Sequence, residues 1–154
     1  MKPKHIKYAL SAFIAFVFIQ SLFFKFTGSY ETHYIFSTLG DWSGFGWFAD
    51  YGAYMVGTAE LIAAIVLFSR LHGFGAFMSV GVMSGAIFFH LFTPLGIEMP
   101  AFNDQGDIVG YDGGLLFGMA CLVWLSALYL TVKDLTSSEG TLSTILPLNT
   151  AEKM

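Results

Sequence analysis

The sequence predicts an all-α integral membrane protein: a bundle of four transmembrane helices, with both termini in the cytoplasm and an aromatic outer loop lying on the membrane. The first observation behind this prediction is composition. Of the 154 residues, 55% are hydrophobic and only 12% are charged, whereas a soluble domain carries about 25% charged residues. The second is that the apolar residues form four long continuous runs without period-two alternation, which is typical of membrane-spanning helices.

The four predicted spans cover residues of about 6–26, 50–68, 72–95 and 113–132. In hydrocarbon the backbone must satisfy its own hydrogen bonds, so each span is expected to be helical. Lysines precede the first run, as in a signal peptide, but its Phe-rich end offers no cleavage site of small residues. We therefore expect this run to remain as a helix. In this interpretation residues 1–133 form one transmembrane domain, and residues 134–154 form a flexible cytoplasmic tail.

Basic residues predict the orientation of the bundle. Apart from Lys25, every lysine and arginine lies at the N-terminus, in the short loop around Arg70 or from Lys133 onward. The two opposite loops carry acidic residues instead. Cytoplasmic segments are enriched in Lys and Arg, and a four-span topology puts these three segments on one side. Three or five spans would break the asymmetry.

The first outer loop, residues 27–48, is rich in aromatic side chains. Thr27 or Ser29 is suited to cap a short helix that runs through about Thr38. Aromatic rings favour the headgroup region, so we expect this loop to lie on the bilayer. Two roles stay open, a plain aromatic belt and a lid over a ligand site. The aromatic residues are Tyr30, Tyr34, Phe36, Trp42, Phe45, Trp47 and Phe48.

The second outer loop, residues 96–112, is acidic. It contains the sequence Asn-Asp-Gln-Gly-Asp, but with Gly106 at the sixth position of an EF-hand, Ala101 and Gln105 would occupy ligand positions. We therefore predict a solvated acidic turn and no metal site. The net charge of −4 comes without a basic patch, which argues against a nucleic-acid partner.

Small residues predict how the helices pack. Gly81 and Gly85 on the third span, and Gly114 and Gly118 on the fourth, fit the GxxxG pattern that lets helix backbones approach closely. On the second span, small residues and Glu60 share one face at helical spacing, so Glu60 should point into the bundle. That face consists of Ala53, Gly57, Glu60, Ala63, Ala64 and Leu67.

Three ionisable residues on three spans form the candidate site: Lys25, Glu60 and His90. Glu60 lies about 13 Å below the outer end of its helix, where an unpaired charge costs at least a few kcal/mol. We expect it to pair with Lys25, with His90 or with both. Taken alone, Lys25 also suits a snorkelling anchor and His90 an interhelical hydrogen bond. His72 is predicted to lie outside the hydrocarbon and has no assigned role.

The surroundings of these three residues resemble the DoxX family, small four-helix bacterial membrane proteins. The likeness spans about Tyr8 to Val132 and rests on the order and spacing of three short motifs. The chain departs from the family in a longer acidic insertion before Asp112 and in Phe26, where Leu is frequent. The resemblance implies a multi-pass protein of the bacterial inner membrane. The motifs are Phe24-Lys25-Phe26, Gly57-Thr58-Ala59-Glu60-Leu61 and Ala86-Ile87-Phe88-Phe89-His90-Leu91.

Some DoxX-like proteins are associated with membrane redox systems, including thiosulfate:quinone oxidoreductase and a thiol-stress complex with superoxide dismutase. The first hypothesis is therefore a redox-associated subunit whose Lys25, Glu60 and His90 line a site for a quinone or for a membrane or soluble oxidoreductase partner. Cys121 is the only cysteine, which excludes a dithiol pair within the chain. Whether the chain is itself an enzyme stays open. The second is a non-catalytic assembly or scaffold protein, and the third a proton-linked carrier acting as a homo-oligomer.

Overall fold

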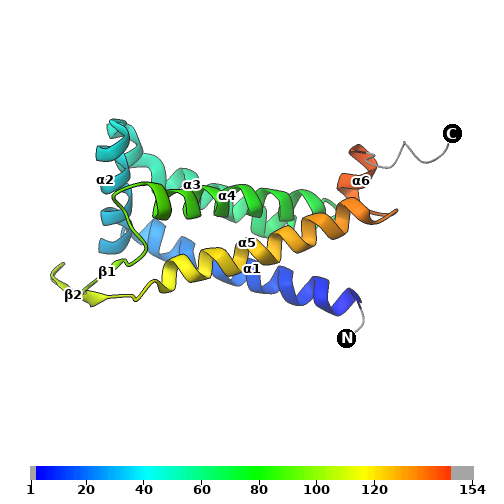
Figure 1. Ribbon diagram of the computed structural model, residues 1–154, viewed down its shortest axis with the longest axis horizontal. Coiled ribbons are helices and arrows are strands. Elements are labelled where there is room, and N and C mark those ends of the chain that lie inside the picture. Colours follow the sequence, from blue (N-terminus) through cyan, green and yellow to red (C-terminus); the bar gives the residue numbers. More distant parts are fainter. Residues whose placement is uncertain (1–2, 147–154) are drawn as a thin grey trace.

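The computed structural model describes residues 3–146, which form six helices and two short strands. Four long helices run alternately up and down along the long axis of the molecule (Figure 1). They are α1 (Pro3–Thr27), α3 (Gly46–Val66), α4 (His72–Phe92) and α5 (Leu115–Thr136). The helix α2 (Tyr30–Ser43) stands across one end of this bundle, and the short α6 (Thr141–Ile145) lies at the other end, where α1 begins (Figure 1).

Among the described residues, three helices are long and apolar enough to cross a membrane. They cover His5–Thr27, His72–Phe92 and Leu115–Thr136. The helix α3 has the same 21-residue length as α4 and contacts both α1 and α4, but it carries Asp50 and Glu60 and is not among these three. The chain is thus mostly helical, as predicted, with three candidate membrane spans, while the fourth span and the topology stay predictions.

Local sequence explains where the long helices end. The third predicted span was expected to continue to residue 95, but α4 ends at Phe92 because Thr93 has extended backbone angles. A residue before proline disfavours the helical region, and Pro94 follows Thr93. The second span starts earlier than predicted, because Gly44 adopts a left-handed conformation (φ 75°) and turns the chain from α2 into α3.

The bundle places small side chains inside and large apolar ones outside. Ala63, Ala76 and Ala127 are fully buried at its centre, packed around Phe18 and Val123. Many of the largest apolar side chains instead face outward, which suits helices solvated by lipid rather than by water. Exposed phenylalanines of the long helices include Phe16, Phe23, Phe77, Phe88 and Phe92.

Close helix packing does not use the predicted GxxxG glycines. A Cβ atom added at Gly81, Gly85 or Gly118 would meet nothing within 4 Å, so the prediction of backbone approach at these positions is wrong. The tight contacts occur elsewhere. A Cβ at Gly57 would lie 3.0 Å from the Phe26 ring of α1, which lets α1 and α3 lie against each other.

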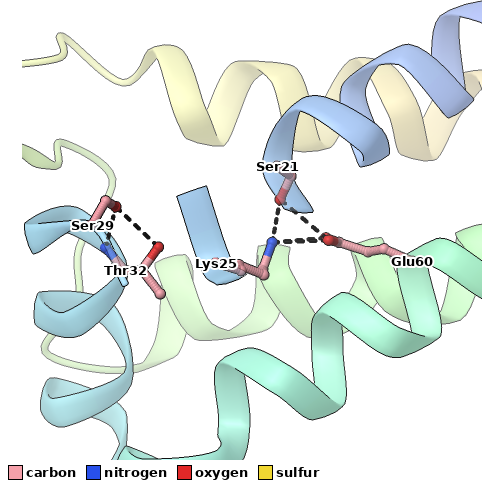
Figure 2. Close-up of polar contacts among 5 residues, drawn as sticks. All are labelled: Ser21, Lys25, Ser29, Thr32 and Glu60. Atoms are coloured by element: carbon pink, nitrogen blue, oxygen red, sulfur yellow. Dashed lines mark hydrogen bonds and ion pairs between the residues drawn. The ribbon is translucent and has the colours of Figure 1, made fainter. Parts of the chain in front are cut away.

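The aromatic outer loop forms the helix α2. Ser29 is its N-cap: the hydroxyl accepts from the backbone N–H of Thr32 at 3.3 Å and donates to the Thr32 hydroxyl at 3.2 Å (Figure 2). The predicted Ser29 cap is therefore confirmed, although the helix continues to Ser43 rather than ending near Thr38. Phe36 and Leu39 of α2 are buried.

The acidic loop is more ordered than the predicted solvated turn. Its strands β1 (Pro100–Phe102) and β2 (Ile108–Tyr111) pair antiparallel, which also departs from a purely helical fold. Asn103 closes the turn between them, because its side-chain oxygen accepts from the backbone N–H of Gln105 at 3.0 Å and of Asp107 at 2.8 Å. An Asx turn of this kind is a common local use of asparagine.

Asp112 joins this hairpin to α5. Its carboxylate accepts backbone hydrogen bonds from Met99 at 2.8 Å and from Gly114 and Leu116 at 2.9 Å each. Burial of the carboxyl acts to raise its pKa, but the three N–H donors hold the pKa below its usual value. The residue therefore caps α5 in its ionised form.

The segment after Lys133 is folded in its described part, contrary to the predicted flexible tail. The helix α5 continues to Thr136, and the Asp134 carboxylate accepts from the backbone N–H of Leu142 at 2.7 Å. Leu142 on α6 is only 3% exposed, so burial of an apolar side chain and one cap hold α6 against the bundle. Residues 147–154 of the predicted tail lie outside the described residues.

Candidate functional site

An ion pair joins α1 to α3 inside the bundle. The Lys25 ammonium lies 2.9 Å from Glu60 Oε2 and 3.1 Å from Glu60 Oε1. Ser21, one turn before Lys25 on α1, donates its hydroxyl hydrogen to Glu60 Oε2 at 3.2 Å and accepts from Lys25 (Figure 2). Three polar side chains thus form one connected group.

The pair is almost completely removed from solvent. The Glu60 side chain is 3% exposed and that of Lys25 14%. Removing two charges from water is costly, and their mutual attraction repays this only when the geometry is good. Here both carboxylate oxygens and the Ser21 hydroxyl accept hydrogen bonds from the Lys25 ammonium. Because the charges of Lys25 and Glu60 cancel, the group carries no net charge.

His90 makes a different polar contact. Its Nδ1 is 2.6 Å from the backbone oxygen of Gly96. A carbonyl oxygen can only accept, so Nδ1 carries the proton. Within residues 3–146, Nε2 makes no hydrogen bond, while the ring edge packs against Phe117 with centroids 5.7 Å apart. Of the predicted partners for Glu60, the structure pairs it with Lys25 and not with His90.

All three candidate residues nevertheless line one cavity of about 460 Å³. Every long helix contributes to its wall, and apart from Ser21, Lys25, Glu60 and His90 the lining is apolar or glycine. A mostly apolar cavity with a few converging polar groups is the usual form of a small-molecule site. Apolar lining residues include Val17, Phe18, Val56, Met83, Phe89, Leu116 and Met119.

The helix α2 covers one end of this cavity. Its Ile35, Phe36 and Leu39 belong to the lining, and Phe36 contacts Phe48 of α3 with ring centroids 5.6 Å apart. Of the two roles left open for the aromatic loop, the position of α2 favours the lid.

A second buried polar contact was not predicted. His72 is only 6% exposed, and its Nε2 lies 3.0 Å from the Ser11 hydroxyl of α1. Its Nδ1 is buried without a hydrogen-bond partner in the described part of the chain. His72 was expected outside the hydrocarbon and without a role, whereas the contact gives it a structural one. Ser11 could have signalled the contact, because it shares the inward face of α1 with Ile14 and Phe18.

Comparison of the chain with protein-family models, with curated proteins and with solved structures finds no match. The resemblance to the DoxX family therefore stays a prediction, and the geometry of the cavity is what bears on function.

Proposed function

We propose that this chain is a DoxX-like, multi-pass protein of the bacterial inner membrane whose central cavity binds a quinone on behalf of a membrane redox system. The observation that carries the proposal is the meeting of the Lys25–Glu60 pair and His90 in one otherwise apolar cavity of about 460 Å³.

The charges of the site favour a neutral ligand head. Because Lys25 and Glu60 neutralise each other, neither an anion nor a cation would find a net opposite charge in the cavity. The three N–H groups of Lys25 are engaged by Glu60 and Ser21. The free polar atom toward a ligand is therefore Nε2 of His90, which in the neutral ring with a proton on Nδ1 would accept from the hydroxyl of the reduced quinol. The apolar lining suits the ring and its hydrocarbon tail.

The direction of the helices supports four membrane crossings. The helices α1 and α4 run toward the end covered by α2, while α3 and α5 run away from it (Figure 1). If α3 crosses with the other three, the N-terminus, the loop around Arg70 and the end of α5 near Lys133 share one side. Their basic residues then place this side in the cytoplasm, with α2 on the outer surface.

A partner must supply the redox chemistry in this proposal. With a single cysteine in the chain, no dithiol pair can exchange electrons with the quinone. We therefore assign to the chain the binding and positioning of the quinone, and to a membrane or soluble oxidoreductase the transfer of electrons.

The test is to extract wild-type protein in its own lipid patches and to quantify co-purifying quinone by mass spectrometry. We expect quinone with the wild type and with E98Q, a matched control at an exposed loop carboxylate, but not with E60Q. The variant K25M/E60Q leaves no unpaired charge and separates loss of binding from loss of folding. Lipid alone in all preparations would overturn the proposal and favour the assembly-factor alternative.

A further inference from the structure

The helices α3 and α4 contact each other at both ends of the stretch along which they run side by side. Near the loop around Arg70, a Cβ added at Gly75 would lie 2.6 Å from the backbone nitrogen of Leu67, which follows α3. Near the opposite end, the rings of Phe48 and Phe89 lie with centroids 6.0 Å apart. Between these two contacts, both helices contribute to the wall of the cavity.

The helix faces that make these contacts also line the cavity. On α4, Gly75, Val82 and Phe89 recur every seven residues and so share one face of the helix. Gly75 and Phe89 contact the α3 segment, while Val82 between them lines the cavity. The cavity therefore extends between α3 and α4. On α3 the corresponding face carries Phe48, Met55 and Ala59, which all line the cavity.

The cavity is open to the outside of the molecule along this stretch. Met55 lines the cavity although it is 54% exposed, and Gly81 of α4 also lines the cavity and is exposed. Each lies about 14 Å from the start of a helix that is about 32 Å long. We call this opening near the middle of both helices the lateral window. It is bordered by Met55, Ala59, Gly81 and Val82.

We propose that the lateral window admits ligands to the cavity from the hydrocarbon of the bilayer, so that the site takes molecules that carry a hydrocarbon chain. At the middle of a spanning helix the surroundings are acyl chains and not water. The chain of such a ligand lies between Met55 and Gly81, and its head reaches Glu60 and His90 inside the cavity. The inference rests on the proposed function, in which α3 crosses the membrane, and it makes a long-chain quinone the ligand class.

Leu116 marks a second place where the cavity lining is exposed. It is 45% exposed and lies in the first turn of α5, at the end of the bundle that α2 covers (Figure 1). Phe36 and Leu39 of α2 line the cavity at that end, so entry there requires α2 to move. The lateral window needs no such movement, because Met55 is already exposed.

The test places the protein in phosphatidylcholine vesicles in which part of the lipid carries a photoreactive diazirine on its acyl chain. After illumination, mass spectrometry identifies the labelled residues. Met83 lines the cavity and is 6% exposed, so its label reports chains that enter. Phe77 is exposed on α4 outside the lining, so its label reports chains that stay outside. We expect label on both residues in the wild type.

Substitutions of Met55 should change the label on Met83 in opposite directions. M55W fills the window and should remove most of this label, whereas M55A widens the window and should increase it. The matched control is I65W, at an exposed residue of α3 that does not line the cavity, and it should leave the label on Met83 unchanged. Label on Phe77 in every variant confirms that the protein is inserted in the bilayer.

Three outcomes would overturn the lateral window while leaving the proposed function intact. The first is label on Phe77 without label on Met83 in the wild type. The second is equal label on Met83 in wild type, M55A and M55W. The third is loss of this label in L116W but not in M55W, which would place the entrance at the start of α5.

Decylubiquinone separates this inference from the proposed function. If a quinone occupies the cavity, an excess of decylubiquinone in the vesicles should reduce the label on Met83 and leave that on Phe77 unchanged. Label on Met83 that depends on Met55 but not on decylubiquinone would support the window and overturn quinone binding.

Discussion

The ammonium of Lys25 and a carboxylate oxygen of Glu60 lie 2.9 Å apart although 35 residues separate them in the chain. The contact fixes the end of α1 against the middle of α3, beside the packed contact of Phe26 with Gly57. Structure and candidate function therefore depend on the same two side chains, and experiments must separate the two roles.

Neutralising one member of this pair should destabilise the protein more than neutralising both. In K25M the Glu60 carboxylate stays buried without its counter-charge, and removing one partner of a buried pair costs about 3–5 kcal/mol. In K25M/E60Q no charge is left unpaired, so much of this loss should be recovered. Thermal unfolding in detergent, followed by tryptophan fluorescence, measures the difference.

The matched control for this cycle is R70M, at an exposed side chain between α3 and α4 that does not line the cavity. It should change the unfolding temperature little. A double variant as unstable as the sum of its two single variants would show that Lys25 and Glu60 do not act as a pair.

The sequence was sufficient to single out Glu60 and its two candidate partners, because an ionisable residue is rare within an apolar span. Glu60 shares a face with Ala53, Gly57, Ala63 and Ala64, and that face is the buried one. Since a charge inside a bundle needs a partner, the choice was limited to Lys25 and His90. Choosing between them required the actual rotation and depth of α1 and α4.

Other features depended on contacts that no pattern specifies. GxxxG describes two small positions but not what lies opposite them, and at Gly81 and Gly85 this is a cavity. The cap at Asp112 could have been inferred from an acid before two glycines and an apolar run. The folded part of the tail depends on one apolar side chain, Leu142, and on the Asp134 carboxylate. The polar composition of this segment predicted a flexible tail and gave no sign of these two contacts.

Substitutions at His90 should separate its two ring nitrogens. In H90N the amide nitrogen can take the place of Nδ1 and keep the bond to Gly96, while nothing replaces Nε2. We therefore expect H90N to keep wild-type stability and to lose about tenfold in decylubiquinone affinity, the value of one lost hydrogen bond. Thermal unfolding and a binding titration measure the two effects.

The control is H90Q, whose amide reaches the place of Nε2 but not that of Nδ1. It should unfold at a lower temperature, because the Gly96 carbonyl loses its donor. Unchanged affinity in H90N would show that Nε2 does not touch the ligand.

The Ser11–His72 contact should contribute to stability as a buried hydrogen bond. In S11A both nitrogens of His72 would be left without a partner, because Nδ1 already lacks one in the described residues. An unsatisfied buried group costs about 1–3 kcal/mol. Replacing both residues in S11A/H72L should restore most of this loss, and urea unfolding of wild type and these two variants would measure it. Equal stability of S11A and wild type would mean that the contact contributes nothing.

The Asp112 cap should make stability depend on pH in the acid range. Its pKa is lowered in the folded protein, because three backbone N–H groups favour the carboxylate. A lowered folded pKa means that the stabilisation is complete above the ordinary value of 3.8 and is lost as the pH falls below it. Wild type should therefore unfold at a higher temperature than D112N near neutral pH, since an amide cannot accept all three bonds.

This difference in unfolding temperature should disappear as the pH falls below 3.8. Protonation of Asp112 then costs the wild type the same stabilisation that D112N has lost. D104N, at an acid in the hairpin turn that caps no helix, should differ little from wild type at any pH. A difference between wild type and D112N that stays constant from pH 7 into the acid range would show that Asp112 stabilises α5 through packing rather than through its charge.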